Sequence, residues 1–285
     1  MSTHTLINTA AIGLAVSCAT TIALATEVTL SPSQDNTLIG PGSGENSNGS
    51  GDGFYAGQIG FFGGSEVIRR GLLQFDLSEI PATATITSVT LNVSVVKTPN
   101  DNEYEFSLHR CNASWGEGAS DFPGGVGAPA EAGDATWVMR FHPDTPWSVE
   151  GGDFEADSSS TTMIGGRADY AFSGDGLIDD VQVWLDNPKL NHGWVMLGTE
   201  GTSLSARKFG SREYADQSKR PTLVVSYEEA GGTPGDFNGD GSVNGADLGL
   251  MLAVWGACPG CPEDLNDDGV VDGADMGLLL ANWTG

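Results

Sequence analysis

The stretch Thr87-Ser-Val-Thr-Leu-Asn-Val-Ser-Val95 decides the fold of the larger part of the chain. Polar and apolar residues alternate along it from Ser88 onward. Because successive side chains of a strand point to opposite faces of a sheet, the alternation predicts a strand with one face in a core and the other in water.

Similar short runs occur on both sides of this stretch, separated by segments rich in Gly, Asn and Pro. We expect strands at Val28–Leu30, Gly71–Phe75, Ile86–Val96, Phe106–Arg110, Ala135–Arg140, Trp194–Leu197, Leu204–Phe209 and Thr222–Tyr227. Only Leu177–Leu185 has helical spacing, with Leu177, Val181, Trp184 and Leu185 on one side. Many short strands with glycine-rich turns predict a mainly β fold, a β-sandwich of jelly-roll type.

Several motifs in this region resemble the DNRLRE domains. They are Asp35-Asn-Thr-Leu38, Arg69-Arg-Gly-Leu-Leu-Gln-Phe-Asp-Leu77, Ile86-Thr-Ser-Val-Thr-Leu91, Ser211-Arg-Glu213 and Arg220-Pro-Thr-Leu-Val-Val225. That group is similar to carbohydrate-binding module family 96, whose jelly rolls occur beside polysaccharide-degrading enzymes and include alginate binders. The resemblance therefore implies a polysaccharide-binding domain. The first motif has Thr37 where the family has arginine.

Binding of an acidic glycan would need fixed cations, preferably the planar fork of arginine. The candidate glycan-binding residues are Arg69, Arg70, Arg207, Lys208 and Arg212. Arg69 and Arg70 are neighbours in one expected strand and would point to opposite faces. The alternative is that these bases form ordinary surface salt bridges. Three tryptophans could stack on a sugar or pack in the core: Trp115, Trp137 and Trp147.

The C-terminal residues contain the same twelve-residue loop twice, 28 positions apart (264 − 236). Oxygen side chains occupy loop positions 1, 3, 5, 9 and 12, position 7 offers its carbonyl, and glycine fills the tight turn at position 6. The expected ligands are Asp236, Asn238, Asp240, Ser242, Asn244 and Asp247 in the first loop, and Asp264, Asn266, Asp268, Val270, Asp272 and Asp275 in the second. Hard oxygen donors at this spacing predict two Ca²⁺ ions.

Each loop leads directly into a short apolar helix, expected at Leu248–Trp255 and at Met276–Trp283. Here the sequence resembles the type I dockerin family, an EF-hand-like pair of loop-helix units. The resemblance implies a small α domain that docks onto a cohesin domain of another protein. Positions 10 and 11, often hydroxyl residues that set specificity in that family, are Gly245-Ala246 and Gly273-Ala274 here. The alternative is a pair of calcium-dependent folding units without a docking role.

The charge distribution supports the metal and argues against two classes of partner. The formal net charge is −26, and no Lys or Arg follows Arg220. Without a metal, the crowded carboxylates should push the repeats apart, whereas metal binding would supply folding free energy. The same acidity argues against nucleic acid, whose phosphates need Lys and Arg, and against anionic membrane surfaces. After the first 25 residues, no segment is long and apolar enough to span a bilayer.

The N-terminal residues indicate an exported protein. An apolar stretch from Ala10 ends in Ala23-Leu-Ala25, which predicts a secretory signal peptide cleaved after Ala25. A lipoprotein site at Cys18 is the alternative. The expected divisions are a signal peptide over 1–25, the β domain over 26–228, a linker over 229–234 and the calcium module over 235–285.

The three cysteines of the mature chain predict one disulfide. Cys258 and Cys261 lie between the calcium loops without a nearby histidine, so a disulfide is favoured over a zinc site. Cys111 is expected to be buried and unpaired.

The sequence contains no recognisable catalytic motif. The mature histidines are His109, His142 and His192, and none lies in a zinc-protease pattern. We therefore expect a non-catalytic exported protein in which the β domain recognises a glycan and the calcium module anchors or docks it. The alternatives are a structural or adhesive cell-surface protein that binds no sugar, and a polysaccharide lyase or hydrolase with an unrecognised site, such as a carboxylate pair for a hydrolase or Tyr214 near Arg212 for a lyase.

Overall fold

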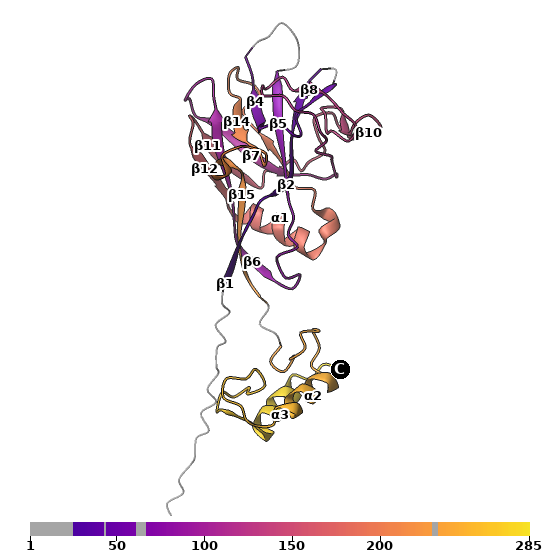
Figure 1. Ribbon diagram of the computed structural model, residues 1–285, viewed down its shortest axis with the longest axis vertical. Helices are drawn as coiled ribbons and strands as arrows, with labels where there is room; N and C mark the ends of the chain where they lie inside the picture. The colour runs from indigo at the N-terminus through magenta and orange to yellow at the C-terminus, as the bar shows by residue number, and fades with distance from the viewer. Residues whose placement is uncertain (1–24, 43, 61–66, 230–232) are drawn as a thin grey trace, which may run out of the picture.

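The computed structural model describes residues 25–42, 44–60, 67–229 and 233–285 (Figure 1). The expected signal peptide thus lies outside the described residues, except for Ala25. That residue begins strand β1, and the β domain ends with strand β15 at Glu228.

The described part of residues 25–229 is mainly β structure. The strands of the large sheet are β1 (Ala25–Leu30), β2 (Pro32–Gly40), β4 (Gly53–Gln58), β5 (Ile68–Phe75), β6 (Thr85–Lys97), β7 (Tyr104–Arg110), β11 (Ser160–Ile164), β12 (Asp169–Ser173), β13 (Trp194–Leu197), β14 (Arg207–Gly210) and β15 (Thr222–Glu228). Short pairs are made by β3 (Asn46–Ser47) with β8 (Ala128–Pro129), and by β9 (Met139–Phe141) with β10 (Thr145–Pro146). The helical elements are α1 (Asp175–Asp186), η1 (Pro188–Leu190) and η2 (Gln217–Lys219).

The large sheet is antiparallel and curled, which confirms the mainly β prediction and is consistent with a β-sandwich (Figure 1). Its order is β1-β15-β6-β14-β4-β5-β13-β7-β11, with β12 also paired to β6 and β2 also paired to β5. The long strand β6 joins two parts of the sheet. It pairs with β15 over Thr85–Asn92 and with β12 over Thr90–Ser94.

The main core combines one face of most strands with helix α1. In β6 the alternation has the predicted effect, since Val89 and Leu91 are buried whereas Thr87 and Ser88 are exposed. Helix α1 packs against β6. Its four apolar residues with helical spacing are all buried, as predicted: Leu177, Val181, Trp184 and Leu185.

A second apolar cluster covers the opposite face of β2, β5 and β13. Along β5, Leu73 belongs to the main core and Leu72 to the second cluster. Along β13, Trp194 belongs to the main core and Val195 to the second cluster. The second cluster is completed by three tryptophans from the long segment between β7 and β11: Trp115, Trp137 and Trp147. This glycine-rich covering segment, residues 111–159, therefore packs over this face of the sheet and shields it from solvent.

Several expected strands differ from those observed. Strands β2, β4, β11 and β12 were not expected, and the strand expected at Ala135–Arg140 is wrong except for its end in β9. There the Thr136 hydroxyl accepts the backbone N–H groups of Val138 and Met139, which turns the chain. The strand expected from Leu204 begins only at Arg207, because Leu204 has a φ of 66°. Strand β2 was missed because its centre is polar, although Asp35, Asn36 and Thr37 are buried.

The C-terminal residues fold into two loop-helix repeats. Their helices are α2 (Gly245–Ala253) and α3 (Gly273–Ala281), and the two-residue strands β16 (Gly256–Ala257) and β17 (Val270–Val271) pair beside them. The core of the repeats is formed by Val243, Met251, Val271 and Leu279. Among the described residues, none of the helices combines the length and apolar character needed to cross a membrane.

Both C-terminal helices begin three residues before the expected positions. The reason is a capping box at each start, in which the side chain of Asn244 or Asp272 accepts a backbone N–H of the first turn and Asp247 or Asp275 accepts the N–H of the capping residue. The carboxylate expected only to bind metal thus also fixes the helix start.

Candidate functional site

The two predicted calcium loops have the same hydrogen-bond pattern. In each loop the position-1 carboxylate, Asp236 or Asp264, accepts the backbone N–H groups of positions 5 and 6 at 2.7–3.2 Å. The position-3 amide oxygen, from Asn238 or Asn266, accepts the N–H of position 5 at 2.9 and 3.0 Å. The position-5 carboxylate accepts the N–H of position 7. Sequence repetition has therefore produced a repeated backbone turn with the same side-chain acceptors in each loop.

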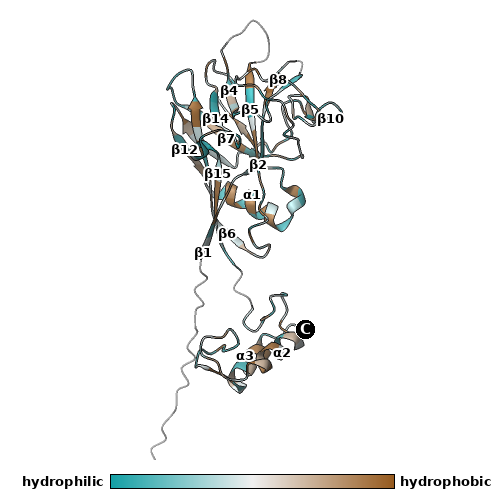
Figure 2. Ribbon diagram, viewed as in Figure 1, coloured by the Kyte–Doolittle hydropathy of each residue, from teal (hydrophilic) through white to brown (hydrophobic). Residues whose placement is uncertain are grey.

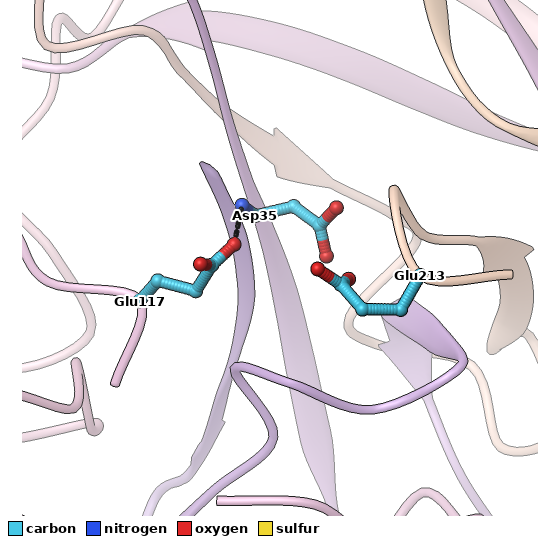
Figure 3. A group of neighbouring side chains, drawn as sticks. All are labelled: Asp35, Glu117 and Glu213. Carbon is cyan, nitrogen blue, oxygen red and sulfur yellow. Dashed lines mark hydrogen bonds between the residues drawn. The ribbon is translucent and has the colours of Figure 1, made fainter. Parts of the chain in front are cut away.

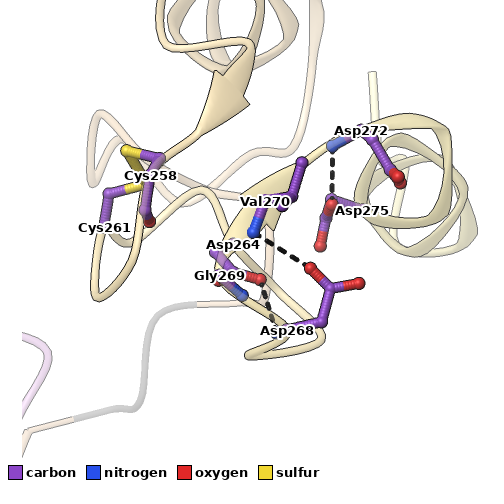
Figure 4. Close-up of a disulfide and its surroundings, with 8 residues drawn as sticks. All are labelled: Cys258, Cys261, Asp264, Asp268, Gly269, Val270, Asp272 and Asp275. Atoms are coloured by element: carbon purple, nitrogen blue, oxygen red, sulfur yellow. Dashed lines mark hydrogen bonds between the residues drawn. A yellow bond between two sulfur atoms is a disulfide. The ribbon is translucent and has the colours of Figure 1, made fainter.

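The carboxylates at position 12 close the loops onto their helices. Asp247 Oδ1 accepts the N–H groups of Phe237 and Asn238, and its Oδ2 accepts that of Asn244. These donors, led by the N–H of Asn244, lower the pKa of Asp247. Asp275 repeats the arrangement in the second loop, where Figure 4 shows it beside Asp272 and close to Asp268.

The donor set of each loop is of the kind that Ca²⁺ prefers. Carboxylate and amide oxygens dominate, and position 7 can add a backbone carbonyl. Position 6 is glycine in both copies, and its positive φ of 85° at Gly241 and 89° at Gly269 is the left-handed turn that such loops require. In this module no cationic side chain competes for the carboxylates.

The cysteines are arranged as predicted. Cys258 and Cys261 form a disulfide in the segment before the second loop (Figure 4). Cys111 is buried and has no disulfide partner among the described residues, and burial raises the pKa of its thiol to about 12.

The helices that follow the loops present large apolar side chains to solvent. The exposed residues are equivalent in the two repeats, and each is 40–52 % exposed: Leu250, Leu252, Trp255, Leu278, Leu280 and Trp283. Only the residues between them, Met251 and Leu279, are fully buried. Figure 2 shows this hydrophobic character over much of α2 and α3. Monomeric proteins seldom leave so many large apolar residues together on one small module.

Two of the five glycan candidates are interior. Arg207 is 0 % exposed, donates to the carbonyls of Gly165 and Asn102 at 2.6 Å each, and lies over the Tyr104 ring. Burial lowers its pKa. Arg69 is 1 % exposed and donates to the carbonyl of Gly125. These arginines connect loop backbones, so neither presents its charge to a ligand.

The other three candidates form ion pairs, as the alternative interpretation expected. Arg70 pairs with Glu200 at 2.7 Å and stacks over Trp137. Lys208 pairs with Asp52, and Arg212 pairs with Glu117 at 2.6 Å. The structure does not unite the five bases in one groove. The three candidate sugar-stacking tryptophans are also buried, in the second cluster.

A cleft beside β6 and β12 offers a different combination of groups. It has a volume of about 540 Å³ and is lined by Val95, Val96, Arg167, Ala168, Asp169, Tyr214, Asp216 and Lys219. Lys219 donates to Asp169 at 2.7 Å, and this bond, with one from Ser94, lowers the pKa of Asp169. Sequence reasoning missed the cleft because Arg167, in the turn before β12, and Lys219, in η2, are far apart in the chain and belong to no motif.

A cluster of three carboxylates lies within the β domain. One oxygen each from Asp35, Glu117 and Glu213 lies within 4.8 Å of the others (Figure 3). Burial raises the pKa of Asp35 well above its ordinary value and also raises that of Glu213. Asp35 is 1 % exposed, whereas the side chains of Glu117 and Glu213 are partly exposed.

Comparison with known proteins identifies no relative. No protein-family model matches the chain, and no curated protein matches it. The DNRLRE and dockerin resemblances therefore depend on the motifs themselves and on the geometry described above.

Replacement of the buried arginine should destabilise the β domain. In Arg207→Ala, the carbonyls of Gly165 and Asn102 lose a charged donor, which should lower the free energy of unfolding by about 3–5 kcal/mol. Urea unfolding followed by tryptophan fluorescence measures the change. The matched control Arg167→Ala removes an exposed arginine and should change stability by at most about 0.5 kcal/mol. Equal losses in the two variants would contradict the structural role of Arg207.

Proposed function

We propose that this chain is an exported, non-catalytic protein that binds a polysaccharide through its β domain and docks onto another protein through its C-terminal module. In this proposal the β domain is a jelly-roll sandwich and the module is dockerin-like, with one Ca²⁺ in each loop. The observation that carries the proposal is the repeated loop-helix unit, whose two copies share their main hydrogen bonds and have equivalent exposed apolar residues.

Calcium is supported by the chemistry of the loops. The first loop contains three aspartates and the second contains five, and no lysine or arginine of the module offsets their charge. In this acidic module, a divalent ion in each loop would supply the neutralisation that side chains do not. The ion would then also stabilise the helix that begins at position 10.

Docking is supported by the apolar faces of α2 and α3. The six exposed leucines and tryptophans remain in water in the isolated chain, which is unfavourable unless a partner covers them. The partner that we propose is a cohesin-like domain, which would cover these exposed side chains.

Glycan binding is supported by the cleft beside β6 and β12. Tyr214 offers an aromatic ring for a sugar face, and Arg167 and Lys219 offer cations for carboxylates or sulfates. This cleft replaces the five bases that the sequence suggested because Arg167 is exposed and has no ion pair among the described residues, although Lys219 pairs with the exposed Asp169.

Loss of the position-1 carboxylates should remove two Ca²⁺ ions per chain. The double variant Asp236→Ala and Asp264→Ala deletes the residue that organises positions 5 and 6 in each loop. Equilibrium dialysis followed by atomic emission measures bound calcium. The control Asp267→Asn removes a charge from the second loop at position 4, which is not a ligand position, and should bind as many ions as the unmodified chain. A double variant that retains all its calcium would refute the loop assignment.

Docking should depend on calcium and on the apolar faces. The chain is passed over an immobilised panel of type I cohesin domains, and at least one should retain it in calcium and release it with chelator. Leu252→Asp combined with Leu280→Asp should weaken retention at least about 100-fold, because charges would be buried in the interface. The control Leu190→Asp changes an equally exposed leucine of the β domain and should have no effect. If no cohesin retains the chain, the docking proposal fails.

The cleft cations should determine binding to acidic polysaccharides. Arg167→Ala combined with Lys219→Ala should weaken binding to alginate by about 10-fold or more, and binding of the unmodified chain should decline with salt. Affinity electrophoresis in alginate gels measures both effects. Lys189→Ala, which removes an exposed lysine outside the cleft, is the control. Equal mobility with and without each of several uronic-acid polymers would instead favour a structural protein that binds no sugar.

A further inference from the structure

The cluster of three carboxylates in the β domain joins segments that are far apart in the chain. Asp35 lies in β2, Glu117 in the covering segment after β7, and Glu213 in the turn after β14. Figure 3 shows the carboxylates of Asp35 and Glu213 turned toward each other, with Glu117 on the other side of the Asp35 backbone N–H that it accepts. Three independent parts of the fold thus bring their acids to one point.

Among the described residues, two carboxylate oxygens of this cluster have no hydrogen-bond partner. Glu117 accepts from the N–H of Asp35 and from two guanidinium nitrogens of Arg212. Asp35 Oδ2 accepts the backbone N–H of Arg212 at 2.8 Å, and Glu213 Oε1 pairs with its guanidinium at 2.8 Å. Within the described part of the chain, Asp35 Oδ1 and Glu213 Oε2 are buried and have no hydrogen-bond partner.

The charge of the cluster is also unbalanced. Three carboxylates and one guanidinium have a formal sum of −2 (−3 + 1). A buried carboxylate is costly unless it is paired, and Asp35 is almost completely buried. One divalent cation would bring this sum to zero and would give both leftover oxygens a partner.

We propose that Asp35, Glu117 and Glu213 hold a Ca²⁺ ion in the β domain, separate from the two C-terminal loops. The donors are all hard oxygens, and Ca²⁺ accepts irregular sets of them at about 2.3–2.6 Å. Two ligands on opposite sides of such an ion are about 5 Å apart, so three oxygens that lie within 4.8 Å of one another can share one ion. Glu213 is partly exposed, so water can reach the site and complete the coordination.

The ion would fasten the covering segment to the sheet. Glu117 belongs to the segment that carries the three tryptophans of the second cluster, and Asp35 belongs to the strand beneath it. An ion bound by both would therefore keep the second cluster covered at the end where β2 begins. The competing arrangement is a proton shared by Asp35 and Glu213, which would satisfy the two oxygens but leave a formal charge of −1.

The test compares the calcium content of the full chain with that of two isosteric variants. Glu213→Gln and Asp35→Asn each remove one charged ligand and should each bind one Ca²⁺ fewer per chain than the unmodified protein. The matched control Glu105→Gln neutralises an exposed glutamate of β7 and should retain the full number. The test compares the number of calcium ions per chain between each variant and the unmodified protein, so it does not require the C-terminal loops to bind calcium. If those loops bind none, the number should fall from one ion to none.

The opposite result is equally clear. If both folded variants bind as many ions as the unmodified chain, the cluster holds a shared proton and the proposal is wrong. Near-ultraviolet circular dichroism establishes that the variants are folded. Should either variant fail to fold, crystals of the unmodified chain grown with Mn²⁺ decide the question. An anomalous peak between Asp35 and Glu213 supports the site, and a map without one overturns it.

Discussion

The scarcity of cations is the constraint on which the rest of this structure depends. The chain has 12 lysines and arginines against 38 aspartates and glutamates. In the β domain, Arg69 and Arg207 are committed to backbone carbonyls, and Arg212 is shared between two glutamates. Few positive charges then remain for a ligand, and none remains for the C-terminal repeats. We propose calcium where acids outnumber the cations beside them.

This constraint connects the two proposed kinds of ion site. In the C-terminal repeats the acids come from one short loop, so their spacing along the chain reveals them. In the β domain the acids come from three distant segments, and the fold alone brings them together. The shortage of cations beside acidic residues can therefore be recognised from the sequence of the C-terminal repeats, but in the β domain only the fold reveals it.

The sequence predicted those parts of the structure that depend on local patterns. The alternation in Thr87–Val95, the apolar spacing in α1 and the oxygen spacing in the loops all appear in the structure. Strand β2 was missed because its polar centre is satisfied by tertiary hydrogen bonds, such as those from Asn36 to the carbonyl of Glu117. A related reason explains why two of the glycan candidates, Arg69 and Arg207, lie in the interior. An arginine in a strand has the same sequence signature whether it faces a ligand, as expected of Arg207, or the carbonyls of a neighbouring loop.

The covering segment over β2, β5 and β13 restricts how a polymer could be held. Three tryptophans occupy the broad outer surface of these strands, so an extended sugar chain cannot lie along them. The cleft with Tyr214 instead opens at the rim, beside loop residues. A polysaccharide bound there would contact the protein through its terminus or a short stretch, and most of its length would remain free to bind other proteins.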